Sequence, residues 1–293
     1  MLKKFALVMV TMLVLAMGVS VASAMPFSGN VIHVTEGGSI QVAIDSASDG
    51  AIIFVHEGTY EERLTIAGKD LKLVAVGDVI LEEPNPDDTQ WPAAISTITV
   101  SESECTIEGF TVDVNGGWSG IYASGGPYYG TGEVEVTITD NTVRDYNRNG
   151  ITVNGEKASG IIMNNLVTGE IGSGWANNGI QIGFGATGIV KDNTVEKNIW
   201  TGEGDWTATA ILLYDVEDVQ VVNNRVEEGQ LGIGVLGDNN KIVNNCLESG
   251  SWGIAIYSGL NNKVIRNTIT DYECDVLDYG EESKVQANMV PEL

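Results

Sequence analysis

The chain reads ITDNTV at residues 138–143, VVNNRV at 221–226 and VIRNTI at 264–269, three versions of one short phrase built around an asparagine. Across its seven occurrences, the aligned asparagines are Asn141, Asn165, Asn193, Asn224, Asn245, Asn267 and Asn288. The last four are separated by 21, 22 and 21 residues. A repeat this short and this regular predicts a solenoid.

A second phrase, a glycine followed by alternating apolar residues, recurs in step with the first. It reads GIYA from Gly120, GITV from Gly150, GIQI from Gly179, GIGV from Gly232 and GIAI from Gly253, with AILL from Ala210 in the same series. Such alternation, rich in Val and Ile, is the pattern of a half-buried strand. Because no repeat contains a helix-length periodic segment, each repeat is expected to supply several short strands.

Short strands that repeat about every 22 residues can bury their apolar face only by coiling onto their neighbours. The chain is therefore predicted to be all-β, a single-stranded parallel β-helix, and parallel crossovers favour a right-handed coil. We expect the asparagines to occupy the corners, because Asn tolerates the left-handed backbone of a sharp turn. Stacked at about 4.8 Å, their amides would bond from coil to coil.

A short helix is expected ahead of the coils. Ser39 suits a helix N-cap, and Ile40, Ala43, Ile44 and Ala47 repeat at helical spacing. The helix should end near Gly50 and cover the first coil. An uncovered coil would expose unpaired backbone groups and invite end-to-end stacking.

Residues 1–24 have the features of a signal peptide. Lys3 and Lys4 precede an apolar run, and Ala22-Ser23-Ala24 is a small-residue cleavage pattern. Cleavage after Ala24 would give a secreted protein, extracellular or in the cell envelope; an uncleaved anchor is the alternative. We expect one continuous domain, with the cap and first coils at 25–94 and the right-handed β-helix coils at 95–293.

From about residue 95 onward, these phrases resemble the right-handed parallel β-helix repeat proteins of the pectin-lyase-like superfamily, including its NosD-like families. Residues 38–66, GSIQVAIDSASDGAIIFVHEGTYEERLTI, are similar to the amino-terminal phrase of pectin methylesterases. The chain lacks the QDT and DFIFG phrases of those esterases, the NTDG and GHG phrases of polygalacturonases and the DPHE phrase of alginate epimerases. The resemblance therefore implies the fold and argues against those three activities.

The charge balance limits the kinds of partner that the protein is expected to bind. With 15 basic and 40 acidic residues, the formal net charge is −25. Such a surface repels nucleic acid and anionic headgroups, so we expect no nucleic-acid partner and at most a peripheral membrane contact. An acidic polysaccharide would need bridging Ca²⁺, for which exposed carboxylates are suitable ligands. The phrases DVNGG near Asp113 and GDNNK near Asp238 resemble calcium-loop fragments, although turns explain them more simply.

No cofactor is certain from the sequence, Ca²⁺ stays open and metal ligands are unknown. The three cysteines, Cys105, Cys246 and Cys274, cannot all pair within the chain, and most are expected to be buried as small hydrophobes. A monomer is expected.

Three consecutive coils are enlarged. The glycine-led phrases start 30, 29, 31, 22 and 21 residues apart, so three intervals exceed the basal length by seven to nine residues. Insertions in a solenoid become loops on one face and often line a binding site. We therefore look for function around residues 116–215.

The inserted segments are rich in aromatic and amide side chains. Rings that stack on pyranose faces, beside polar groups that bond hydroxyls, are typical of a sugar-binding groove. The candidate substrate-binding residues are Trp118, Tyr122, Tyr128, Tyr129, Trp175, Asn177, Asn178, Gln181, Trp200 and Trp206. The alternative is that these loops fold back over the solenoid and the indoles cover apolar surface.

Catalysis is undecided by the sequence. A lyase of the resembled superfamily needs a base, commonly Arg or Lys, and Arg148 lies suitably beside the groove. A hydrolase needs carboxylates whose environments separate their pKa values, and Asp145, Asp205 and Asp215 are available.

We predict an exported β-helix protein that binds a polysaccharide or cell-envelope glycan. If it is an enzyme, it is a polysaccharide lyase or glycoside hydrolase. A non-catalytic structural or adhesive surface protein is the alternative.

Overall fold

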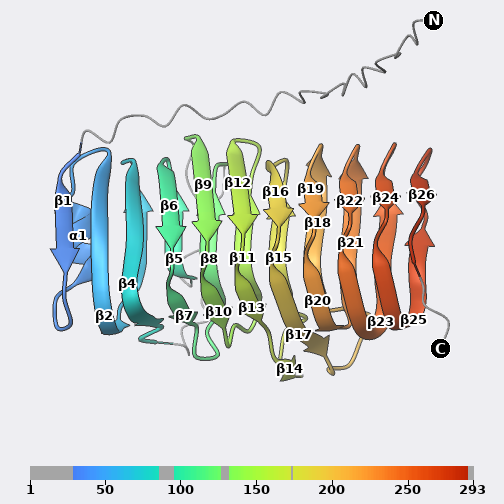
Figure 1. Cartoon of the computed structure of the whole chain (residues 1–293), viewed down its shortest axis with the longest axis horizontal. Coiled ribbons are helices and arrows are strands. Elements are labelled where there is room, and N and C mark those ends of the chain that lie inside the picture. The colour runs from blue at the N-terminus through green and yellow to red at the C-terminus, as the bar shows by residue number, and fades with distance from the viewer. Residues whose placement is uncertain (1–28, 86–95, 127–131, 173, 290–293) are drawn as a thin grey trace, which may run out of the picture.

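The computed structural model describes residues 29–85, 96–126, 132–172 and 174–289. They form a parallel β-helix, in which strands β1 to β26 wind around one apolar core and helix α1 lies at the N-terminal end (Figure 1). The strands pair in parallel from coil to coil, as between β11 and β15. The predicted all-β architecture is confirmed.

Three faces run the length of the solenoid. The first face carries the glycine-led strands and consists of β3 (Leu64–Ala67), β5 (Ser96–Ser101), β8 (Ser119–Ser124), β11 (Asn149–Asn154), β15 (Asn178–Gly183), β18 (Thr209–Glu217) and β21 (Leu231–Asp238). The second face consists of β1 (Val31–Val34), β6 (Glu104–Glu108), β9 (Val134–Thr139), β12 (Ala158–Met163), β16 (Thr187–Lys191), β19 (Gln220–Val222), β22 (Lys241–Val243), β24 (Lys263–Ile265) and β26 (Lys284–Gln286).

The third face consists of β7 (Thr111–Asp113), β10 (Thr142–Arg144), β13 (Leu166–Thr168), β14 (Ile171–Gly172), β17 (Thr194–Trp200) and β20 (Arg225–Gly229). Four long strands bend from one face into another: β2 (Ala51–Glu61), β4 (Leu71–Glu82), β23 (Cys246–Ser258) and β25 (Thr268–Asp278).

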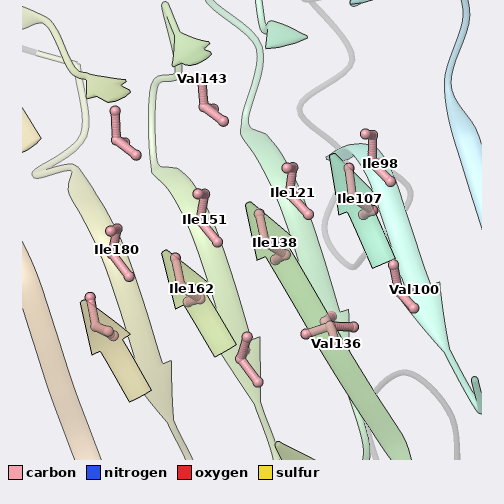
Figure 2. Packing of buried hydrophobic residues seen from close by; sticks show 14 of the residues in the cluster. Ile98, Val100, Ile107, Ile121, Val136, Ile138, Val143, Ile151, Ile162 and Ile180 are labelled. Carbon is pink, nitrogen blue, oxygen red and sulfur yellow. The ribbon is translucent and has the colours of Figure 1, made fainter. Parts of the chain in front are cut away.

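The core is a set of stacked aliphatic rows. Ile121, Ile151 and Ile180 form one row because β8, β11 and β15 pair residue for residue. A second row, from Ile107 through Ile138 to Ile162, comes from the second face, and Figure 2 shows both rows between the ribbons. All of these side chains are fully buried, so each coil hides its apolar face against its neighbours.

The predicted asparagine ladder is present. In Asn193, for example, the backbone N–H and the side-chain Nδ2 each donate to Oδ1 of Asn224 at 3.0 Å. The Nδ2 also donates to the carbonyl oxygens of Ile162 and Lys191, both at 3.0 Å. The ladder runs from Asn141 to Asn288, and its buried amides satisfy backbone groups that the corner leaves unpaired.

The prediction that these asparagines adopt the left-handed conformation is wrong. The positive φ belongs to the residue before each of them: Asp140, Asn164, Asp192, Asn223, Asn244, Arg266 and Ala287, with φ between 55° and 58°. The preceding residue makes the turn with its side chain outward. The ladder asparagine is then free to point its amide into the corner, where its partners lie.

Helix α1 (Ile40–Ser46) is confirmed, although it ends earlier than predicted. The Ser39 hydroxyl accepts from the backbone N–H of Val42 at 3.2 Å. The Glu62 carboxylate accepts from the N–H groups of Ile40 and Gln41 at 2.8 and 3.1 Å, so the first turn is capped from another coil. Ile40, Ala43 and Ile44 are buried.

The cysteines differ from the prediction. Cys105 is buried, and this burial raises the pKa of its thiol, but Cys246 and Cys274 are only half-buried. Cys246 directly follows a ladder asparagine and faces outward, 3.7 Å from a carboxylate oxygen of Glu248. No helix within the described residues is long and apolar enough to cross a membrane.

Candidate functional site

Four tryptophans of the enlarged coils are linked by contacts between their loops, ahead of the first-face strands. The rings of Trp118 and Trp175 meet edge to face, with centroids 5.2 Å apart. Trp200 Nε1 donates to the carbonyl oxygen of Gly174 at 3.2 Å, which ties it to the loop that carries Trp175. Ring atoms of Trp200 and Trp206 lie 3.6 and 3.7 Å from the Cβ position of Gly204. We call Trp118, Trp175, Trp200 and Trp206 the tryptophan band.

The band is open to solvent at two positions. Trp206 is 72% exposed and Trp175 is 57% exposed, whereas Trp118 and Trp200 are half-buried. An exposed indole leaves a face free for stacking on a ligand. Loops that folded back to cover apolar surface would have buried these two rings, so the alternative interpretation does not describe them.

A row of polar side chains lies on the outer side of β8, β11 and β15. Tyr122, Thr152 and Gln181 stand in register there. Gln181 Nε2 donates to Asn154 Oδ1 at 3.0 Å, and Asn154 Nδ2 donates to Tyr122 Oη at 3.3 Å. The Thr152 hydroxyl is fully buried and finds no hydrogen-bond partner among the described residues.

Arg148 connects the tryptophan band to this polar row. Its backbone N–H donates to the Trp118 carbonyl at 2.9 Å, and its Nη1 donates to the carbonyl of Ala176. With its amide oriented to satisfy these neighbours, Asn178 accepts through its side-chain oxygen from Arg148 Nη1 at 3.1 Å. Burial lowers the pKa of the Arg148 guanidinium. No ion pair within the described part of the chain includes Arg148.

A pocket of about 270 Å³ opens beside the band, with Trp175 and Asn177 in its wall. Asn177 Nδ2 donates to the Glu170 carbonyl at 3.1 Å, but its buried Oδ1 accepts from no described residue. Asn147 also lines the pocket. The pocket therefore offers an amide acceptor next to an aromatic ring.

Asp145 lies in the same turn as Arg148. Burial raises the pKa of its carboxyl group, the neighbouring Asp113 carboxylate adds to the rise, and Arg144 opposes it. Its backbone carbonyl accepts from Gly116 N, a residue of the pocket wall, at 2.7 Å. A raised pKa is what a carboxyl group needs to act as a general acid.

The other two predicted carboxylates lie apart. Asp205 is exposed in the turn before β18. Asp215 follows Tyr214 at the far end of the first-face strands, six residues beyond Thr209, which pairs with Asn178. At about 3.3 Å per residue, Asp215 is roughly 20 Å from the Arg148 end of the face. Tyr128 and Tyr129 fall outside the described residues.

Sequence reasoning missed Asn147, Asn149 and Asn154. Asn149 pairs with Asn178 and Asn154 pairs with Gly183. The signal was available in the glycine-led alignment, which places Asn149 and Asn178 at the same position of adjacent coils. Among the described residues, no three His, Cys, Asp or Glu side chains form a group that could hold a metal ion, and Ca²⁺ binding stays a prediction.

Comparisons with known proteins agree with this architecture. A family described as a right-handed β-helix region matches residues 93–288. No curated protein matches the chain. An alginate lyase from Paenibacillus sp. str. FPU-7 superposes with a TM-score of 0.62 at 14% identity, covering 88% of this chain and 95% of the lyase.

A polygalacturonase from Erwinia carotovora ssp. carotovora gives a TM-score of 0.55 at 8% identity, over 89% of this chain and 97% of the polygalacturonase. The pectate lyase Pel9A gives 0.54 at 15% identity, over 88% of this chain and 79% of the lyase. At these identities the likeness extends to the fold alone.

Proposed function

The chain belongs to the right-handed β-helix family, and on that basis we propose that it is an exported protein that binds a polysaccharide along the tryptophan band. The observation that carries this proposal is the pair of exposed rings, Trp175 and Trp206, on neighbouring enlarged coils. Each ring can stack on the apolar face of a pyranose. Asn177, which lines the pocket with Trp175, has a side-chain oxygen with unused hydrogen-bonding capacity among the described residues.

For bond cleavage, the arrangement favours a lyase over a glycoside hydrolase. Arg148 supplies a half-buried guanidinium that forms no ion pair within the described residues, and burial lowers its pKa. A hydrolase would need a second carboxyl group facing Asp145 across the sugar, and Asp215, at the far end of the first-face strands, is too distant for that role. Bridging Ca²⁺ would assist a carboxylated substrate against the net charge of −25.

Binding is tested first on a glycan array, followed by titration of the glycans that bind. We expect Trp175→Ala and Trp206→Ala each to weaken binding about tenfold, since a stacking contact contributes about 1–1.5 kcal/mol. Trp252→Ala is the matched control, because Trp252 is 36% exposed but lies outside the band. Unchanged affinity in both band variants would show that the ligand binds elsewhere, and a protein that binds no glycan would refute the proposal.

Cleavage is tested on the same glycans, with Ca²⁺ and with a chelator. A lyase releases unsaturated uronate ends, which absorb in the ultraviolet, and a hydrolase releases reducing ends without that absorbance. We expect Arg148→Gln to abolish lyase products while the circular dichroism of the protein stays unchanged. Products from Arg148→Gln at the wild-type rate would remove Arg148 from the reaction.

A further inference from the structure

Three lysines stack in register on the second face. Lys241, Lys263 and Lys284 are the first residues of β22, β24 and β26, and the strand pairing places each directly beside the next. All three are exposed. Consecutive coils put their Cα atoms about 4.8 Å apart, in a straight line along the solenoid axis. We call them the lysine ladder.

The charges of the ladder are not neutralised by contact within the described residues. Some other basic residues are paired: Lys72 with Glu108 at 2.6 Å, and Arg144 with Asp113 at 2.7 Å. None of the ion pairs within the described ranges includes a ladder lysine. Like charges placed side by side on a sheet repel. Asp238, Glu281 and Glu282 lie within three residues of ladder lysines in the sequence, but in the part of the chain that the structure describes none of them forms an ion pair with the ladder.

An apolar row runs parallel to the ladder. Val243 and Ile265 occupy the next outward positions of β22 and β24, and both are half-buried. Val222 of β19 continues the row into the preceding coil. Arg266 follows Ile265 at the corner and adds a fourth cation near the same end of the face. The surface thus offers a line of cations beside a line of apolar side chains.

We propose that the lysine ladder binds a linear polysaccharide that carries one anionic group per sugar and lies parallel to the solenoid axis. A glycan that lies along the solenoid axis spans several strand spacings of about 4.8 Å, so more than one of its anionic groups can lie over the lysine row. The apolar row would contact the sugar rings. At physiological salt the Debye length is about 8 Å, so carboxylates elsewhere on the molecule oppose this contact only weakly.

The test uses a soluble glucan oxidised at C6, which carries one carboxylate per sugar, and its methyl ester as the uncharged polymer with the same backbone. Binding is measured by calorimetry at low and high NaCl. We expect Lys263→Gln to weaken binding of the charged polymer about three- to tenfold and Lys241→Gln/Lys263→Gln/Lys284→Gln to abolish it. Lys72→Gln is the control, since it removes the same charge from β4 and should leave affinity unchanged.

All of these variants are also measured in a Trp175→Ala/Trp206→Ala background. The ladder lies on a different face from the tryptophan band, so its binding should persist there, and failure of one site leaves the other measurable. The proposal is overturned if the triple lysine variant binds the charged polymer with wild-type affinity and salt dependence. It is equally overturned if the methyl ester binds as tightly as the charged polymer and the lysine substitutions have no effect. Circular dichroism verifies that the triple variant is folded.

Discussion

At the scale of single residues, neighbouring asparagines have different tasks. Asn224 is buried, accepts from Asn193 and donates from Nδ2 to the carbonyl oxygens of Val190 and Val222 at 2.9 and 3.2 Å. Asn223, one position earlier, is exposed and takes the turn with a φ of 57°. One residue supplies hydrogen bonds to the corner, and the other supplies its backbone shape.

Two substitutions should distinguish the task of Asn224 from that of Asn223. Asn224→Ala should lower the free energy of unfolding by at least about 2 kcal/mol, because several buried partners lose their hydrogen bonds at once. Asn223→Gly keeps the left-handed backbone and removes only an exposed side chain, so its effect should stay within about 0.5 kcal/mol. Urea unfolding followed by circular dichroism compares them, and equal losses would contradict the division of tasks.

Asp145 should make stability depend on pH. Its folded-state pKa is raised, first by burial and then by Asp113, so the folded chain binds its proton more tightly than the unfolded chain. The stabilisation is therefore complete below the unfolded pKa and is lost as pH rises through the folded pKa. We expect the melting temperature of the wild-type protein to fall as the pH rises above about 4, and we expect a smaller fall in Asp145→Asn. If the melting temperature of Asp145→Asn depends on pH as it does in the wild type, other titratable groups cause the dependence.

At the scale of the strand, the glycine-led pattern reflects close packing at the start of each first-face strand. A Cβ atom on Gly179 would lie 2.4 Å from Val195 Cγ1 and 2.6 Å from the Ala210 carbonyl oxygen. The backbones of successive coils approach too closely there for a side chain, and the core is already filled.

Gly179→Ala should therefore destabilise the fold by about 1–3 kcal/mol through overpacking. Gly172→Ala is the control, because a Cβ atom there would meet nothing within 4 Å. Thermal unfolding measures both variants. Equal melting temperatures would mean that the coils can separate enough to accept the methyl group.

The repeat phrases predicted the coils and the helix because both depend on local pattern. The left-handed turn was assigned to the wrong residue because Asn suits both the turn and the buried ladder. Where two asparagines are adjacent, sequence alone does not say which of them turns the chain. A second ladder, in which Asn240 N–H donates to Asn262 Oδ1 at 2.9 Å, went unnoticed although NNK recurs at 239–241 and 261–263. For the tryptophan band, the sequence predicted only that the inserted loops are rich in aromatic side chains. It did not predict the contacts between the tryptophans, because these depend on how neighbouring coils fold the loops.

At the scale of the whole molecule, the chain carries a formal net charge of −25, and mutual repulsion should weaken the folded state. Salt screens this repulsion, so we expect the melting temperature to rise between 10 and 150 mM NaCl. A gain of about 1 kcal/mol corresponds to about 2–4 °C in a domain of this size. A melting temperature that falls or stays constant would contradict this expectation.

The same measurement tests calcium. At equal ionic strength, CaCl₂ should match NaCl if the ion only screens charge, and a larger rise would reveal a bound ion. The comparison therefore separates a general effect of the acidic surface from a specific site.

Because each ladder asparagine bonds only within its own coil and with the adjacent coils, a coil is a unit that could be added or removed. A deletion of residues 246–267 would join Asn245 to Thr268 and bring Asn288 to the place that Asn267 holds, so the ladder would close without a missing partner. The length of the rod could then change by duplication or loss of a 22-residue genetic segment while the fold stays constant. Evolution could thus extend the lysine-bearing end without disturbing the tryptophan-bearing middle.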